Sequence, residues 1–248
     1  MTILAIDTST QWCSVALVNP QGGSGEPQSP LLLMRHENLG PESSQYALDW
    51  IEALLTEANF NFRELEAVAV GIGPGAFTGI RIGVGIGQGM SFAADLPCLP
   101  IVCLDAIALE GINSLKASPG DTLLVTADAR MNEVYWASYA VQSNGLPARV
   151  GDIYVSSPEK IELPNSAFYL IGNASTIYPN EMSVLTKHAK AIDTHAVPHA
   201  RSIAALGLDA LANGLQVSAE DLQPLYVRDK VAQTISEREQ ARSVHISS

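Results

Sequence analysis

Basic side chains are scarce in this chain. Fourteen Lys and Arg stand against 26 Asp and Glu, which gives a formal net charge of −12 at pH 7. An acidic surface repels phosphate backbones, so the composition argues against unaided binding to nucleic acid. Cysteines are also few: Cys13, Cys98 and Cys103 form no CxxC pair and leave an odd count. Such a count is typical of free thiols in a reducing compartment, so we expect a cytoplasmic protein.

Long hydrophobic runs are missing as well. The longest uncharged apolar stretch, residues 82–94, is shorter than the ~20 residues that a membrane-spanning helix needs. The first residues lack the basic segment of a secretory signal, and Asp7 interrupts them early. Because 47% of the residues are apolar and only 16% are charged, we expect a folded globular chain that is not embedded in a membrane.

Several sequence patterns of catalytic sites are absent. Residues 71–83 read GIGPGAFTGIRIG, but the Gly-Lys-Ser/Thr ending of a Walker A loop is missing, so a structural turn is the favoured interpretation. His195 and His199 are four residues apart, yet Pro198 between them disfavours the helix that would align two metal-binding imidazoles, and loop histidines are expected. No GxSxG motif occurs. The sequence therefore predicts no catalytic residue and no metal site.

Hydrophobic periodicity predicts two similar series of strands and helices. In the first series we expect a turn at 19–30, helices at 44–58 and 79–94, and strands at 3–6, 13–18, 31–35, 65–72 and 98–104. Ser43 or Ser44 is available to cap the first helix. In the second series we expect a helix at 202–211 that ends at Asn213 and Gly214, and strands at 124–128, 134–139, 151–156 and 168–171.

The second series repeats the opening of the first. Residues 124–128 (LVTAD) align with residues 3–7 (ILAID) at a sequence offset of 121. Both copies read as a strand, a turn led by an aspartate and a returning strand, which predicts two lobes of related topology. We expect an α/β fold with an N-terminal lobe at 1–105, a C-terminal lobe at 106–225 and a polar, flexible tail at 226–248. The helix around 202–213 could pack back on the N-terminal lobe.

Two aspartates lead the repeated turns. Asp7 and Asp128 each follow an apolar strand, and Thr8 and Ser9 follow the first of them. These side chains could hold a phosphate and its metal ion at the mouth of a hairpin. An aspartate in this position can instead close an Asx turn with its own backbone. Both interpretations remain open at the level of the sequence.

The helix predicted at 79–94 is rich in glycine and apolar nearly all round. Interior glycines cost about 1 kcal/mol each relative to alanine, so close packing must offset them. Gly79, Gly83 and Gly87 share one face, and Gly85 and Gly89 lie nearly opposite. This pattern predicts burial by the sheet on one side and by another helix or a subunit on the other. We expect a partner interface formed by Tyr46, Trp50, Leu54, Arg81, Gly83, Gly85, Ile86, Gly89 and Met90; burial of both sides within the chain is the alternative.

Four segments of the sequence resemble the TsaB (YeaZ) family. They read ILAIDTST from residue 3, GIGPGAFTGIRIGVGIGQG from residue 71, DARMNEVYWASY from residue 128 and PLYVR from residue 224. The resemblance implies a two-lobed actin-like or Hsp70-like ATPase (ASKHA) fold with a degenerate second lobe. It also implies a non-catalytic partner of the transferase TsaD, which adds a threonylcarbamoyl group to adenosine 37 of tRNAs that read codons starting with A.

The resemblance also carries expectations about partners and ligands. It implies a heterodimer with TsaD, help in recruiting the ATPase TsaE, a homodimer when TsaD is missing, and contact with tRNA only through the complex. The catalytic relative carries an HxxxH pair on its first helix, whereas residues 44–58 contain no histidine. The glycine pair of nucleotide-binding relatives is reduced here to Gly172. We therefore expect no tightly bound cofactor, although an adenine nucleotide could bind at the partner interface.

An enzyme of the same superfamily is the alternative function. It would be an ATP-dependent kinase or ATPase that uses Asp7 and Asp128, or a peptidase of the M22 type. The missing histidine pair argues against the peptidase, and the missing glycine argues against the kinase.

Overall fold

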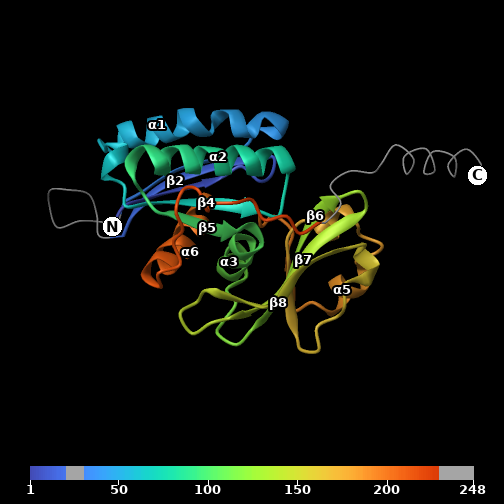
Figure 1. Ribbon diagram of the computed structural model, residues 1–248. Helices are drawn as coiled ribbons and strands as arrows, with labels where there is room; N and C mark the ends of the chain where they lie inside the picture. The colour runs from blue at the N-terminus through green and yellow to red at the C-terminus, as the bar shows by residue number, and fades with distance from the viewer. Residues whose placement is uncertain (21–30, 229–248) are drawn as a thin grey trace, which may run out of the picture.

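The computed structural model describes residues 1–20 and 31–228, which form two lobes (Figure 1). Most of the turn expected at 19–30 lies outside the described residues. The first sheet has the strand order β3-β2-β1-β4-β5, and the second has the order β10-β9-β6-β7-β8. The strands of the first sheet are β1 (Ile3–Asp7), β2 (Trp12–Asn19), β3 (Leu31–Asn38), β4 (Ala67–Gly73) and β5 (Cys98–Val102). Those of the second are β6 (Thr122–Arg130), β7 (Glu133–Val141), β8 (Pro147–Ser156), β9 (Phe168–Ile171) and β10 (Ala191–Asp193).

The two sheets repeat one topology. β1 pairs antiparallel with β2 and parallel with β4, and β6 pairs in the same way with β7 and β9. Asp7 at the end of β1 therefore corresponds in position to Asp128 near the end of β6. The two-lobed, actin-like α/β fold predicted from the sequence is confirmed.

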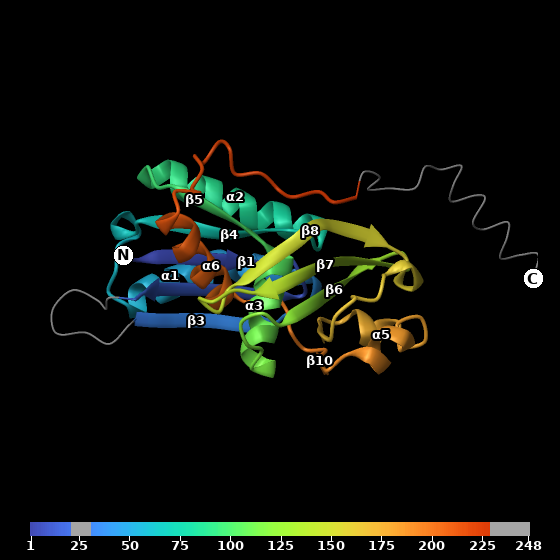
Figure 2. The same ribbon diagram turned by 90° about the horizontal axis from the view of Figure 1, so that it is seen from below.

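Helices cover both sheets, and two of them are exchanged between the lobes. α1 (Ala47–Glu57) and α2 (Phe77–Ala94) lie on one face of the first sheet, and α6 (Ala200–Ala212) covers its other face (Figures 1 and 2). α3 (Cys103–Leu115) follows the first sheet in the chain but packs into the core of the second. Neither half of the chain therefore holds a complete core by itself. Among the helices of the described ranges, none is long and apolar enough to cross a membrane.

The two exchanged helices meet at a partly buried ion pair. Glu110 of α3 is 8% exposed and pairs with Arg201 of α6, whose Nε donates to Oε1 at 2.9 Å. Ser202 donates its hydroxyl to the same carboxylate. Burial alone would raise the pKa of Glu110, but the hydrogen bonds from Arg201 and Ser202 outweigh it and hold this pKa below its ordinary value. The carboxylate is therefore charged at neutral pH and ties the lobes together.

Some elements differ from the sequence prediction. The first α-helix begins later, because Gly40–Tyr46 form a 3-10 helix, and Ser43 donates to the carbonyl of Thr10 (3.2 Å) instead of capping α1. The strand expected at 98–104 ends at Val102, where α3 begins. The second lobe also contains two short helices, α4 (Ala174–Ile177) and α5 (Ser183–His188), which hydrophobic periodicity did not predict.

Residues 226–228, which the sequence assigns to a flexible tail, contact the body of the protein. Tyr226 accepts a hydrogen bond from Arg81 of α2, and Arg228 bonds to the hairpin between β6 and β7. These contacts hold residues 226–228 on the body of the protein. Residues 229–248 lie outside the described residues.

Candidate functional site

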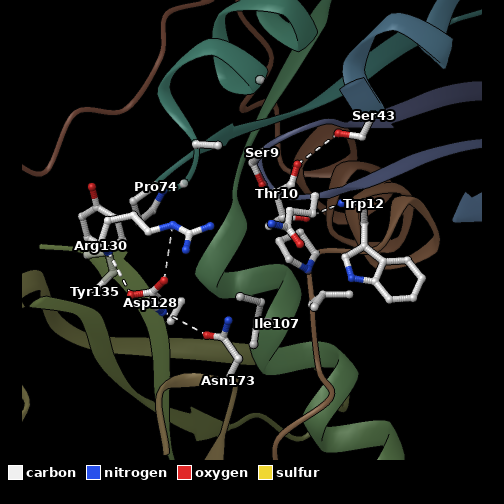
Figure 3. Close-up of a pocket in the computed structure, with 18 of the residues that line it drawn as sticks. Ser9, Thr10, Trp12, Ser43, Pro74, Ile107, Asp128, Arg130, Tyr135 and Asn173 are labelled. Atoms are coloured by element: carbon white, nitrogen blue, oxygen red, sulfur yellow. Dashed lines mark hydrogen bonds and ion pairs between the residues drawn. The ribbon is translucent and has the colours of Figure 1, made fainter. Parts of the chain in front are cut away.

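A cleft of about 510 Å³ opens between the lobes (Figure 3). The turn after β1 forms one wall, and the hairpin between β6 and β7 forms the opposite wall. The start of α2 and the 3-10 helix before α1 also line it. The polar side chains on the two walls include Ser9, Thr10 and Ser43 from the first lobe and Asp128, Arg130 and Asn173 from the second.

Asp7 does not line this cleft. Its carboxylate is fully buried and accepts hydrogen bonds from the amide of Ser9 (3.1 Å), the hydroxyl of Ser9 (3.0 Å) and the thiol of Cys103 (3.3 Å). Burial raises the pKa of Asp7, and the hydrogen bonds oppose this shift only in part. The geometry is that of an Asx turn, the structural one of the two interpretations.

The glycine-rich segment receives this turn in close contact. Thr8 donates its hydroxyl to the carbonyl of Gly79 (2.7 Å), and the amide of Ala76 donates to the carbonyl of Ser9 (2.6 Å). A Cβ added at Gly79 would lie 1.9 Å from the carbonyl oxygen of Thr8, and one at Gly83 would lie 2.7 Å from its Oγ1. Glycine is required at these positions because the turn packs against the α2 backbone. Thr8 is itself buried and is not available to a ligand in the cleft.

Asp128 reaches the cleft, but its carboxylate already has partners. It accepts hydrogen bonds from the amide of Arg130 (2.9 Å) and the hydroxyl of Tyr178 (2.8 Å), and Nε of Arg130 lies 3.5 Å away. Asn173 accepts the backbone amide of Asp128 (2.9 Å). Burial, followed by the hydrogen bond to Asp128, raises the pKa of Tyr178 to about 12, so the phenol remains a donor at neutral pH. Figure 3 shows Arg130 extending into the cleft beside Asp128.

A second surface lies on the outer side of α1 and α2. Phe92 is 78% exposed and Leu48 is 56% exposed. Nothing lies within 4 Å of a Cβ added at Gly85 or Gly89. These glycines and Phe92 share one side of α2, because residues three and four apart are neighbours on a helix. A groove of about 760 Å³ is lined by α1, the loop after it and Met90 of α2.

Proteins of one family match the chain along most of its length. The family profile described as "TsaD: tRNA N6-adenosine threonylcarbamoyltransferase" matches residues 39–236. The chain is 30% identical to "tRNA threonylcarbamoyladenosine biosynthesis protein TsaB" of Escherichia coli (strain K12), over 94% of this chain and 96% of that protein. It is 31% identical to the protein of the same description from Haemophilus influenzae, over 93% of this chain and 95% of that one. "YeaZ from Pseudomonas aeruginosa", 33% identical, superposes with a TM-score of 0.80 over 91% of this chain and 99% of that structure.

The chain belongs to the TsaB (YeaZ) family. The residues of its cleft do not fit the magnesium nucleotide of an actin-like ATPase. Asp7 is buried behind Ser9, and the carboxylate of Asp128 is already hydrogen bonded. Gly172 has a packing role, since a Cβ there would lie 2.1 Å from the carbonyl oxygen of Thr126. Within the described ranges, no group of three His, Cys, Asp or Glu side chains is placed to hold a metal ion.

The structure divides the residues that the sequence predicts for the partner interface. Leu54 is fully buried in the first lobe, and Gly83 packs against Thr8, so these two predictions are wrong. The other seven predicted residues are exposed or half-buried at the outer surface: Tyr46, Trp50, Arg81, Gly85, Ile86, Gly89 and Met90. Leu48 and Phe92 are also exposed on this surface but were not singled out from the sequence, although Phe92 lies on the helical face of the open glycines.

Stacked rings lie beside the cleft where the chain returns to the first lobe. The ring centroids of Trp12 and His36 are 4.5 Å apart, and those of His36 and His199 are 3.8 Å apart. His199, expected in a loop, is 7% exposed and caps α6 by accepting the amide of Arg201 at Nδ1 (3.3 Å). Burial lowers the pKa of His199 to about 4, and His36 adds to this effect. Burial also lowers the pKa of His36. Both rings are therefore neutral at neutral pH.

We expect the free energy of unfolding to fall as the pH drops from about 6.5 towards 4. Both histidines have a lower pKa in the folded chain than in the unfolded chain, so in this range the unfolded chain binds more protons. His199 alone should account for a loss of about 2 to 3 kcal/mol at pH 4. Urea denaturation at a series of pH values measures this loss. His199→Asn keeps an acceptor at the N-cap but removes the titrating ring. An equally steep pH dependence in this variant would rule His199 out as its source.

Proposed function

We propose that this chain is a non-catalytic subunit of the machinery that makes threonylcarbamoyladenosine in tRNA, and that it acts by binding a TsaD-type transferase. The relatives named as TsaB biosynthesis proteins support the pathway, because they match the chain along nearly its whole length. The match of residues 39–236 to the TsaD profile supports a partner built on the same fold. Chains of one fold can pair through equivalent surfaces in a pseudo-symmetric way.

The outer side of α1 and α2 carries this proposal, and we call it the α1–α2 face (Tyr46, Leu48, Trp50, Gly85, Gly89 and Phe92). Its three most exposed apolar side chains, Tyr46, Leu48 and Phe92, are 41%, 56% and 78% exposed. Leu48 lines the groove beside α2, whereas Tyr46 and Trp50, four residues apart, lie on the other side of α1. Exposed large apolar groups gathered on one helical layer are typical of interaction sites. The open glycines allow a helix of the partner to approach the α2 backbone closely. When TsaD is missing, the same face would bind a second copy of the chain in a four-helix contact with two-fold symmetry.

The interlobe cleft supports a role without catalysis. A kinase or ATPase would need a carboxylate that faces the nucleotide and its metal ion. Asp7 is fully buried and Asp128 is hydrogen bonded to Tyr178. An M22-type peptidase is not favoured either, because the described residues contain no group of side chains placed to hold a metal ion. The partner would supply the chemistry, and an adenine nucleotide would bind at the junction with the partner rather than in this cleft.

The charge of the chain supports indirect contact with tRNA. A formal net charge of −12 opposes binding to a polyanion, so the partner would supply the basic surface. The TsaE-type ATPase would join the assembled pair. This reaction would take place in the cytoplasm.

The experiment that tests the proposal compares the chain alone, TsaD alone and their mixture. We expect the mixture to give one complex by light scattering, and threonylcarbamoyl transfer to tRNA to rise when the chain is added. The chain alone should show neither ATP turnover nor tRNA binding at physiological salt. ATP turnover by the chain alone, lost in Asp128→Asn, would favour the enzyme instead. A mixture in which the two masses stay separate would refute the partner role.

A further inference from the structure

We propose that residues 217–228 form a strap that fixes the angle between the lobes, with Arg228 as its latch on the second lobe. After α6 the chain runs along α2 and then reaches the hairpin between β6 and β7, as the red segment shows in Figures 1 and 2. The chain also crosses between the lobes at the start of α3 and before α6. A third crossing restricts the relative motion that the first two would still allow.

The strap is held firmly on the first lobe. Val217 forms two backbone hydrogen bonds with Cys98 of β5, each of 2.9 Å. Leu222 is fully buried beneath α2, and Gln88 donates its side-chain amide to the carbonyl of Leu222 (2.9 Å). Leu225 then donates its amide to the carbonyl of Ile72 at the end of β4 (2.8 Å). The strap is therefore part of the first lobe up to residue 225.

Arg228 joins the strap to the second lobe. Its side chain is 17% exposed, forms an ion pair with Glu133, and donates to the carbonyl of Ala129 (3.1 Å) and the sulfur of Met131 (3.4 Å). Between Ala129 and Glu133, the three residues 130–132 have φ values of 62°, 57° and 57°. Residues with a side chain adopt this left-handed conformation only at a cost. Arg228 therefore bonds both ends of a hairpin connection that is held in a costly backbone conformation.

The latch has consequences for the cleft. Asp128 and Arg130, which line the second wall, belong to the hairpin that Arg228 holds. Releasing the latch should let this wall move away from the turn after β1. The strap thereby sets the width of the cleft in the isolated chain.

The strap also connects the latch to α2. Tyr226 lies two residues before the latch, accepts a hydrogen bond from Arg81 (2.8 Å), and lies with its ring centroid 5.9 Å from that of Phe77. Phe77 and Tyr226 are 40% and 47% exposed at the beginning of α2. A partner seated along α2 would therefore meet the strap. This part of the inference rests on the proposed function.

Spin labels on the two lobes test the strap. The positions are Glu42→Cys and Glu159→Cys, both exposed, while the native cysteines are buried and react slowly. Pulsed electron paramagnetic resonance then measures the distance between the lobes. We expect Arg228→Ala and Glu133→Gln to shift this distance and broaden its distribution. Arg35→Ala is the matched control, because it removes an exposed ion pair with Glu57 within the first lobe (2.6 Å). Arg35→Ala should leave the distance unchanged.

Hydrogen exchange, read together with the interlobe distance, shows whether Arg228 fixes the angle between the lobes or stabilises only the hairpin between β6 and β7. We expect amides of residues 129–133 to exchange at least about tenfold faster in Arg228→Ala, because a charge-assisted contact is lost. Faster exchange without any change in the interlobe distance, in both Arg228→Ala and the milder Glu133→Gln, would overturn the strap. These measurements use the chain alone, so their failure leaves the proposed function standing. Adding TsaD to the unmodified chain should slow exchange of the amides of residues 129–133. If TsaD protects only the amides of α2, the coupling between the strap and the partner is overturned.

Discussion

Gly85→Leu is expected to weaken both the homodimer and the complex with TsaD while leaving the fold intact. The open space beside Gly85 is the approach path for a partner helix, and an overpacked contact typically costs about 1 to 3 kcal/mol. Leucine is a better helix former than glycine by roughly 0.5 to 1 kcal/mol, so the isolated chain should melt at the same temperature or slightly higher. Analytical ultracentrifugation measures the association, and circular dichroism measures the melting.

Gly83→Leu is the matched control for this prediction. The two positions lie in the same helix and gain the same propensity, but a Cβ at Gly83 meets the hydroxyl of Thr8 at 2.7 Å. We expect Gly83→Leu to lower the free energy of unfolding by about 1 to 3 kcal/mol or more. If Gly85→Leu folds normally and binds itself and TsaD with unchanged affinity, the α1–α2 face is not the interface.

Gly172→Ala is expected to destabilise the chain strongly. The backbone at Gly172 has φ +102°, and a Cβ there would lie 2.1 Å from the carbonyl oxygen of Thr126. Both groups belong to the backbone of the second lobe, so neither can move away cheaply. Conformational strain and overpacking together should cost about 3 to 5 kcal/mol, which corresponds to a fall of roughly 10 °C in the melting temperature.

Gly120→Ala is the matched control, because it separates the cost of the positive φ angle from the cost of steric overlap of the added Cβ. Gly120 has φ +89°, but nothing lies within 4 Å of its added Cβ. It should lose only about 1 to 2 kcal/mol, the cost of the backbone conformation. Urea denaturation of the two variants measures the difference. Equal losses would mean that Gly172 is retained for its φ angle alone and not for its contact with Thr126.

The sequence by itself determined nine of the ten strands in the described residues and their repeat; only β10 (Ala191–Asp193) was not predicted. The strand at 168–171 has the predicted bounds, and the turns of Asp7 and Asp128 fall at equivalent ends of their strands. These features are local, because a short apolar run bounded by turn residues predicts a strand without knowledge of its neighbours. The family motifs are equally local, so family membership followed from the sequence as well.

Other features depended on contacts between distant segments. α3 is buried almost all round between the second sheet and α6, so its apolar residues show no helical stripe that sequence reasoning could recognise. The exchange of α3 and α6 between lobes has no local signal at all, because it depends on which sheet face remains uncovered.

The glycines of α2 and the aspartate of β1 show the same division between sequence and tertiary structure. Glycine spacing predicted two flat sides of the helix, but only the position of Thr8 decided that the side of Gly83 is filled within the chain and the side of Gly85 is open. The sequence also left the role of Asp7 undecided. Cys103, which lies 96 positions away in the chain, and Ser9 bury and bond its carboxylate, and burial is a property of the packed fold rather than of any one segment.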